Sequence, residues 1–190
     1  ADGNLVEKWT SGKEPHMIEK LPAGKYILRE ETAPFGYVIA QDIEFEVKET
    51  DEIQKVAMKD EAAVGKIIIS KKSEDGKALA GAKFEIRDTD GKVIETLTTD
   101  KDGHAESGEL PIAAFKDGKY EEAVTYTVVE VEAPEGYLLD STPKEVKFEY
   151  KDGKTKVALY TLEVTNKPTE PKLPQTGDNM NPWVFAGFGL

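Results

Sequence analysis

The chain has 190 residues, a formal net charge of −12 and no cysteine. Without thiols it can form neither disulfides nor cysteine-based metal centres, and an acidic chain is a poor match for nucleic acid or anionic membranes, which need a basic surface. The length allows one or two domains, and a hydrophobic content of 38% suits small β cores better than one large core.

Short strands separated by turns are expected along the whole chain. Ile43, Phe45 and Val47 alternate with acidic residues, as in a half-buried strand. No long amphipathic helix is indicated, only a single turn at 112–115, and Trp9 is interpreted as a core residue. Asp-Gly pairs predict turns or hairpins at Asp2, Asp75, Asp90, Asp102, Asp117 and Asp152. Many short strands with regular turns predict an all-β protein of sandwich type.

An internal repeat divides the chain. Residues 26–37 and 126–137 share Tyr, Glu, Ala, Pro, Gly and Tyr at identical spacing, which indicates tandem modules. The second copy carries an insertion at 112–125, whereas the first copy has nothing to match 65–89. The predicted boundaries are 1–62 for a first module without its opening strands, 63–168 for a complete second module, and 169–190 for a proline-spaced tail.

The missing opening strands have two explanations. The favoured one is that the chain is a fragment of a longer protein, and the other is that a second polypeptide supplies the strands. The connection between the modules is only a few residues long, at 61–64. We therefore expect the modules to sit end to end with limited freedom.

Three polar residues, Lys71, Glu130 and Asn166, each extend an apolar strand face, because side chains two positions apart on a strand share a face. Buried lysine loses its proton more readily and a buried carboxyl keeps its proton, so the amine becomes a nucleophile and the acid can activate an amide oxygen. If the three side chains meet, the amine can attack the amide, release ammonia and form an isopeptide bond. The alternative is that they are solvated strand ends. Lys72 competes with Lys71, but the face pattern prefers Lys71. The faces are Ile67, Ile69 and Lys71; Tyr126, Val128 and Glu130; and Leu162, Val164 and Asn166.

These segments resemble the Cna protein B-type domain, also called the SpaA-type or prealbumin-like domain, of Gram-positive adhesins and pilins. The likeness rests on 69–72, on 79–84 and on the repeated YxxxExxAPxGY box. It implies tandem immunoglobulin-like β-sandwiches and a Lys71–Asn166 bond for which Glu130 is the catalytic proton shuttle. In the first module it makes Glu30 the equivalent glutamate and Asp60 an acceptor without its lysine in this chain. The chemistry is self-directed and needs no cofactor.

A short motif near the end of the chain reads LPQTG, between a proline-spaced polar stretch and the mostly apolar run 181–190. It resembles the LPxTG cell-wall sorting signal. The likeness implies that a sortase cleaves after Thr176 and joins this residue to an amine of peptidoglycan or of a pilin. The apolar run is shorter than the roughly 20 residues that span a bilayer, so a truncated C-terminus is expected. The motif residues are Leu173, Pro174, Gln175, Thr176 and Gly177.

These features predict a secreted structural stalk or pilin-type protein, covalently attached to the Gram-positive cell wall or pilus. The alternative is an adhesin module that binds a host matrix or surface protein, and the insertion at 112–125 is then the candidate binding loop. An enzyme acting on an external substrate is the weakest reading, because hydrolase motifs and phosphate-binding loops are absent. No metal site is expected, since His16 and His104 lie far apart without cysteine partners.

Overall fold

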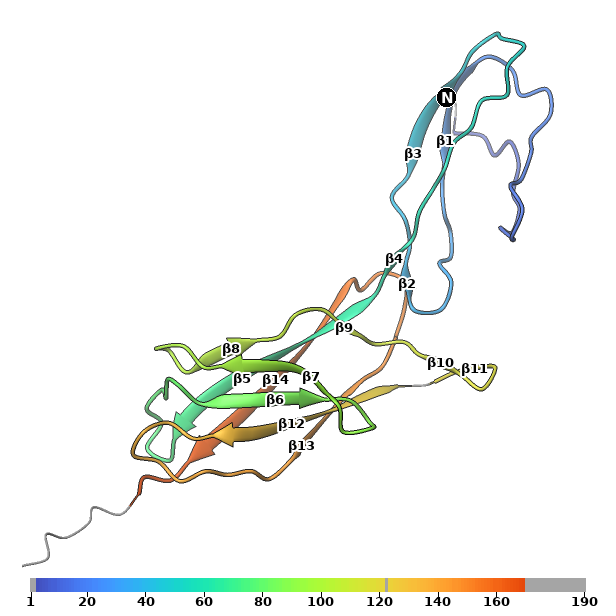
Figure 1. Cartoon of the computed structure of the whole chain (residues 1–190). Helices are drawn as coiled ribbons and strands as arrows, with labels where there is room; N and C mark the ends of the chain where they lie inside the picture. Colours follow the sequence, from blue (N-terminus) through green and yellow to red (C-terminus); the bar gives the residue numbers. More distant parts are fainter. Residues whose placement is uncertain (1–2, 122, 170–190) are drawn as a thin grey trace, which may run out of the picture.

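The computed structural model describes residues 3–121 and 123–169, so the LPQTG motif lies outside it. The described part contains strands and loops, which confirms the all-β prediction. Two modules follow each other along an elongated shape, and the chain leaves the second module at the end far from the first (Figure 1). Within the described ranges, no helix is long and apolar enough to cross a membrane.

The strands are short in the first module and longer in the second. The first module contains β1 (Gly24–Leu28), β2 (Tyr37–Val38), β3 (Ile43–Val47) and β4 (Glu61–Ala62). The second module contains β5 (Val64–Ser73), β6 (Lys83–Arg87), β7 (Val93–Thr98), β8 (His104–Glu106), β9 (Leu110–Pro111), β10 (Phe115–Lys116), β11 (Lys119–Tyr120), β12 (Val124–Glu132), β13 (Lys144–Phe148) and β14 (Val157–Asn166).

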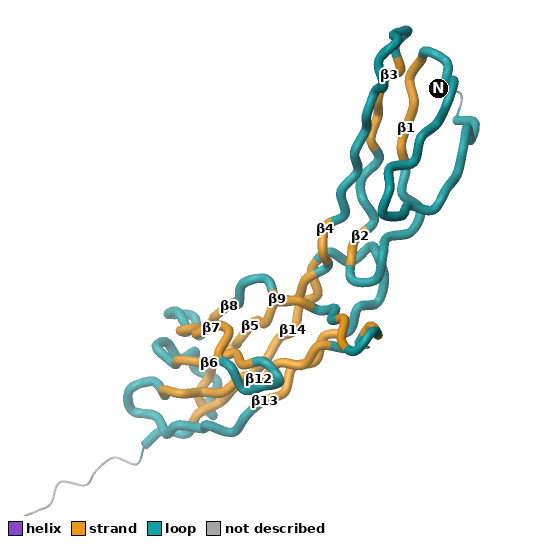
Figure 2. The backbone as a smooth tube through the Cα atoms, turned by 45° about the vertical axis from the view of Figure 1, so that its right-hand side comes forward, coloured by secondary structure: helices purple, strands orange, loops and turns teal. Residues whose placement is uncertain are grey.

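The second module is a sandwich of two four-stranded sheets, and Figure 2 shows its strands below those of the first module. One sheet has the order β13-β12-β6-β7, and the other has the order β14-β5-β8 with β9 also paired to β5. The first and last strands of the module, β5 and β14, run parallel over their full lengths. Side chains of both sheets fill the space between them, and the fully buried ones include Ile67, Ile69, Phe84, Ile86, Val128 and Val146.

Strand β5 shows why this sequence forms a core strand. Its side chains alternate between buried and half-buried along all ten residues, so one face lines the core. Gly65 is required on that face, because a Cβ there would lie 2.8 Å from the side chains of Ile112 and Phe148. One face of the strand is therefore packed in the core from Gly65 onward.

The first module has one antiparallel pair, β1 with β3, and a small bridge between β2 and β4. Its inward side chains, such as Tyr26 and Phe45, are half-buried and stack at 5.9 Å. Residues 56–60, where the family resemblance implies a last strand carrying the acceptor Asp60, form no strand. The reason is that β14, their counterpart, pairs with β5, and the described part of the first module contains no equivalent of β5. The core role expected of Trp9 is also wrong: it is 36% exposed and stacks on His16.

The junction between the modules is a packed contact. Ala63, between β4 and β5, is 3% exposed. The Ile39 N–H donates to Gly153 O at 2.7 Å, and the Tyr150 hydroxyl donates to Tyr37 O at 2.8 Å. These bonds join loops of both modules beside the short connection, in keeping with the limited freedom expected from its length.

The insertion at 112–125 forms the β10–β11 hairpin instead of the helical turn expected at 112–115. An Asp-Gly pair at its tip has positive φ at both residues, as a two-residue hairpin turn requires. The Tyr120 ring lies 4.6 Å from the ring of Phe35 in the first module, and Phe35 also lies 4.8 Å from Tyr150. Part of the proposed binding loop is thus in contact with the neighbouring module.

Candidate functional site

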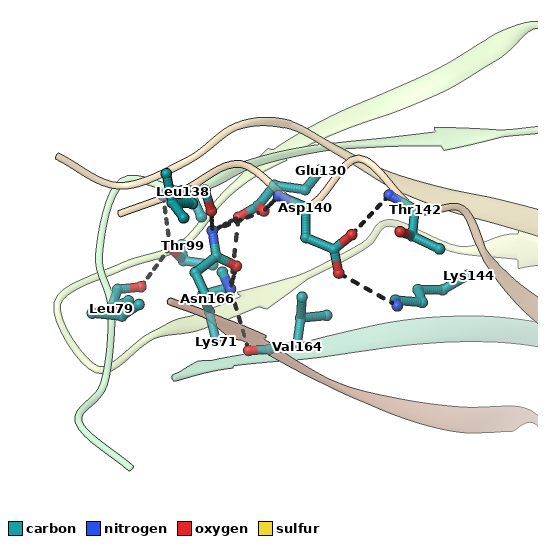
Figure 3. Close-up of polar contacts among 11 residues, drawn as sticks. Lys71, Leu79, Thr99, Glu130, Leu138, Asp140, Thr142, Lys144, Val164 and Asn166 are labelled. Atoms are coloured by element: carbon teal, nitrogen blue, oxygen red, sulfur yellow. Dashed lines mark hydrogen bonds and ion pairs between the residues drawn. The ribbon is translucent and has the colours of Figure 1, made fainter. Parts of the chain in front are cut away.

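Three strands bring Lys71, Glu130 and Asn166 together inside the second module (Figure 3). Lys71 is near the end of β5, Glu130 near the end of β12, and Asn166 is the last residue of β14. Their exposed fractions are 0%, 2% and 2%. Charged and amide side chains are seldom so deeply buried without partners, so the contacts among them decide what the site can do.

The strand register explains the meeting. In the parallel pair of β5 and β14, Lys71 lies opposite Val164, and Asn166 follows two residues later on the same face. Glu130 reaches them from the other sheet, where it lies opposite Phe84 on β6. A register shift between Glu130 and Glu132 disrupts the ladder beside the site, as β-bulges often do next to functional residues.

The side chains form one connected network. Lys71 Nζ contacts Asn166 Oδ1 and lies 3.6 Å from Glu130 Oε1 and 3.4 Å from Val164 O. Asn166 Nδ2 donates to both Glu130 oxygens, at 2.9 and 3.1 Å. Glu130 therefore faces the amide nitrogen, and not the amide oxygen that the sequence-based hypothesis assigned to it. The amine and the amide are adjacent, with the carboxyl beside both.

Burial changes the acid–base chemistry of the lysine. Removal from water lowers the pKa of Lys71, and the nearby negative charge of Glu130 offsets part of this effect. A lowered pKa enlarges the fraction of neutral amine, which is the nucleophilic form. The site therefore favours a lysine that can attack, with the Glu130 carboxyl 3.6 Å from its nitrogen.

The lysine backbone is held on both sides. The Lys71 N–H donates to Gly103 O at 2.7 Å, and the Leu79 N–H donates to Lys71 O at 3.0 Å. Gly103 has a φ of +72°, and a Cβ there would lie 2.2 Å from Lys71 O. Only glycine suits this turn, which places the backbone of Lys71 between two loops.

The neighbouring lysine occupies a different environment. The side chain of Lys72 is 45% exposed and pairs with Glu163 at 3.7 Å, on the outer face of the same two strands. It does not approach Glu130 or Asn166. The geometry therefore places Lys71, and not Lys72, beside the amide.

The first-module residues do not form an equivalent cluster. Glu30 accepts a hydrogen bond from the Ala40 N–H at 2.7 Å, and both Glu30 and Asp60 are half-buried. In the part of the chain that the structure describes, no ion pair or hydrogen bond joins Asp60 to Glu30 or to a lysine. The same described residues contain no group of three or more His, Asp or Glu side chains suited to a metal ion.

Two backbone groups of the site were missed by the sequence analysis. Leu138 O accepts a hydrogen bond from Asn166 Nδ2 at 2.8 Å, and the Asp140 N–H donates to Glu130 Oε2 at 3.1 Å. Both follow the Pro-Gly turn of the repeated box. Backbone atoms are the same in every residue, so the sequence does not mark them. The one signal in the sequence is that Asp140 follows Glu130 at the same spacing as Ala40 follows Glu30.

Comparison with known proteins points to one family. The family model of the SpaA prealbumin-like fold domain matches residues 1–62 and 65–163. Among solved structures, the TIE protein of Bacillus anthracis is 30% identical with a TM-score of 0.52, over 78% of this chain and 26% of that one. A search among curated proteins found no match.

Two pilins are also similar. The major pilin subunit BcpA of Bacillus cereus is 28% identical with a TM-score of 0.42, over 54% of this chain and 28% of that one. The major pilin SpaA of Corynebacterium diphtheriae is 21% identical with a TM-score of 0.44, over 55% and 30%. The chain spans less than a third of each of these three proteins.

Proposed function

Because the chain belongs to the SpaA family of prealbumin-like fold domains, we propose that it is a stalk segment of a Gram-positive surface protein or pilin. We also propose that Lys71 and Asn166 become joined by an isopeptide bond. The observation that carries the proposal is the buried network of Lys71, Glu130 and Asn166, in which an amine, an amide and a carboxyl are in mutual contact.

The reaction balances within this site. Lys71 passes one proton to Glu130, and its neutral Nζ attacks Asn166 Cγ. The new Nζ–Cγ bond forms, the Cγ–Nδ2 bond breaks, and Glu130 helps to transfer protons to the departing nitrogen. Lysine ammonium and amide become the isopeptide and an ammonium ion, and Glu130 ends as it began. Glu130 is thus a general acid and base, placed by its contacts to Nδ2.

The position of the bond suits a load-bearing role. The chain enters the second module at β5 and leaves it after β14. A Lys71–Asn166 bond would therefore join the first strand of the module to the last one. Tension would pass from Val64 to Lys71 and across to Asn166, and would bypass the intervening residues, a separation of 95 positions. In a cysteine-free chain such a bond takes the place of a disulfide.

Attachment to the wall or to a pilus rests on the sequence motif at 173–177, which lies outside the described residues. We propose that a sortase is the processing partner and that an amine of peptidoglycan or a pilin is the acceptor. Incubation with a matching sortase and an amine nucleophile should release residues 177–190. Their retention with several sortases of the wall-anchoring and pilus types would remove this part of the proposal.

Intact-protein mass spectrometry tests the bond. The purified chain should be lighter than its sequence mass by one ammonia, and Lys71→Ala, Glu130→Ala and Asn166→Ala should each restore the full mass. Lys72→Ala is the matched control and should keep the loss. A wild-type chain at its full sequence mass would exclude the bond.

A further inference from the structure

The proposed reaction uses an amide, and the structure supplies a reason for asparagine at position 166. We propose that the backbone carbonyl of Leu138 is a specificity-determining group, which selects an amide acceptor and turns its nitrogen toward Glu130. The inference rests on the proposed isopeptide reaction and identifies what distinguishes asparagine from aspartate at this site.

The amide nitrogen of Asn166 faces a backbone acceptor. Leu138 O lies 2.8 Å from Asn166 Nδ2 (Figure 3). A backbone carbonyl can only accept a hydrogen bond, so the group that faces it must be a donor. The amide nitrogen meets this condition, whereas an amide oxygen or an ionised carboxylate would place two acceptors against each other. Together with the two Glu130 oxygens and Lys71 Nζ, the carbonyl fixes which end of the amide faces Glu130 and leaves.

The carbonyl belongs to a segment that is tied down next to the acceptor. The Leu138 N–H donates to Lys167 O at 2.8 Å, and the Thr169 N–H donates to Gly136 O at 2.8 Å. These bonds fasten the turn to the residues that directly follow Asn166. A different side chain at position 166 consequently faces the same carbonyl, because these backbone hydrogen bonds hold the carbonyl in place.

Asparagine is neutral at position 166, whereas an aspartate is neutral there only when its carboxyl is protonated. The charged groups around it are Lys71 on β5, Glu130 on β12 and Asp140 in the loop after β12, which itself pairs with Lys144 at 3.6 Å. Lys71 and Glu130 balance each other when the third group is a neutral amide. A second carboxylate would leave a buried negative charge without a partner, which is costly.

Protonation solves both problems at once, because it removes that charge and supplies a hydrogen for Leu138 O. The protonated carboxyl can then react: the Nζ–Cγ bond forms, a C–O bond breaks, water leaves, and the surplus proton of the ammonium passes through Glu130 to solvent. Bond formation in an aspartate variant should therefore require acid, whereas the wild-type reaction should not.

The test compares wild type with Asn166→Asp by intact mass at about pH 8 and about pH 5, because burial and a neighbouring carboxylate raise the pKa of a carboxyl above its usual value of about 3.9. We expect the variant to have its full mass at the higher pH and to lose one water after transfer to the lower pH. Wild type should lack one ammonia at both. Asn166→Ala is the unlinked control, and circular dichroism checks that each variant is folded.

Equal linkage of the variant at both pH values would overturn the proposal, and so would a folded variant that stays unlinked at both. A wild-type chain at full sequence mass is a separate result, which removes the proposed function itself and this inference with it.

A second variant separates the Leu138 carbonyl from the charge of Glu130. Replacing Leu139 with its α-hydroxy acid converts the amide after Leu138 into an ester, whose carbonyl is a weaker acceptor. In the Asn166→Asp chain this change should lower the pH at which half of the molecules are linked, because the protonated carboxyl loses its acceptor. An unchanged midpoint would assign the pH dependence to Glu130 alone and overturn the role of Leu138.

Discussion

The two modules carry the same glutamate motif, but only the second module buries it. In both, the glutamate accepts a hydrogen bond from a backbone N–H ten residues ahead, from Ala40 to Glu30 and from Asp140 to Glu130. Glu130 is 2% exposed and touches an amide and an amine. Glu30 is half-buried and has neither partner in the described part of the chain.

The difference shows that the local sequence sets the turn and the glutamate contact, whereas the surrounding sheets set the burial of the glutamate. The repeated box forms its own turn and its own glutamate contact in both modules, because these depend on residues close in sequence. Burial needs an opposing sheet, which β5 and β14 provide over Glu130. Residues 53–60 have no strand partner among the described residues. Chemistry that depends on a desolvated lysine is therefore expected in the second module.

The largest expected effect comes from changing the equivalent glutamates one at a time. Glu130→Gln should prevent the bond and lower the free energy of unfolding by about 4–5 kcal/mol, as in the chain-entropy model for a cross-link that closes about 100 residues. Glu30→Gln should cost less than about 1 kcal/mol, since it alters one half-buried hydrogen bond. Urea denaturation with intact mass measures both, and equal losses from the two variants would contradict the comparison.

Substitutions at two glycines test whether the turn at Gly103 positions the backbone of Lys71. Gly103 and Gly76 both have positive φ, but a Cβ at Gly103 would collide with Lys71 O, whereas one at Gly76 meets open space. Gly103→Ala should therefore lower the free energy of unfolding by about 1–3 kcal/mol more than Gly76→Ala. It should also reduce the fraction of linked chains. The same cost for both alanines would show that the turn does not position Lys71.

The aromatic contact at the junction tests how far the first module depends on the second. Protease should cut within 3–60 before 65–167, because the first module has the less complete core. Phe35→Ala removes ring contacts to Tyr120 and Tyr150 and should weaken the first module by about 1–2 kcal/mol, which speeds its cleavage. Ile53→Ala, at a side chain 73% exposed, is the control. Cleavage at an unchanged rate would mean that the contact does not stabilise the module.

The smallest effect concerns acid and an ion pair of the first module. Hydrogen bonds from Arg29, the nearest at 2.6 Å, hold the pKa of Asp42 below its usual range. The stabilisation is therefore present above the unfolded-state pKa of about 3.9 and is lost as the pH falls through the lower folded value. Asp42→Asn should reduce the melting temperature slightly at neutral pH and not at all in strong acid. A pH-independent difference between the two proteins would disprove this contribution.

Much of the site could be predicted from the chain alone, because alternation along a strand is a local property. Period two placed Lys71, Glu130 and Asn166 on apolar faces, and the structure buries all three. The internal repeat likewise identified Glu30 as the counterpart of Glu130, and both accept a hydrogen bond from the backbone N–H ten residues later. The strand implied around Asp60 did not form, because a strand needs a neighbour to accept and donate its hydrogen bonds, and that neighbour is not a local feature.

The sequence by itself determined the strand faces, the repeated motif and the candidate chemistry, since each depends on residue type and spacing. Only the tertiary structure decided that Lys71 and not Lys72 meets the amide, that Leu138 O faces Asn166 Nδ2, and that the insertion packs on Phe35. These are contacts between distant segments, and several involve backbone atoms. Register, sheet packing and loop placement set them, and no pattern of side chains along one strand contains that information.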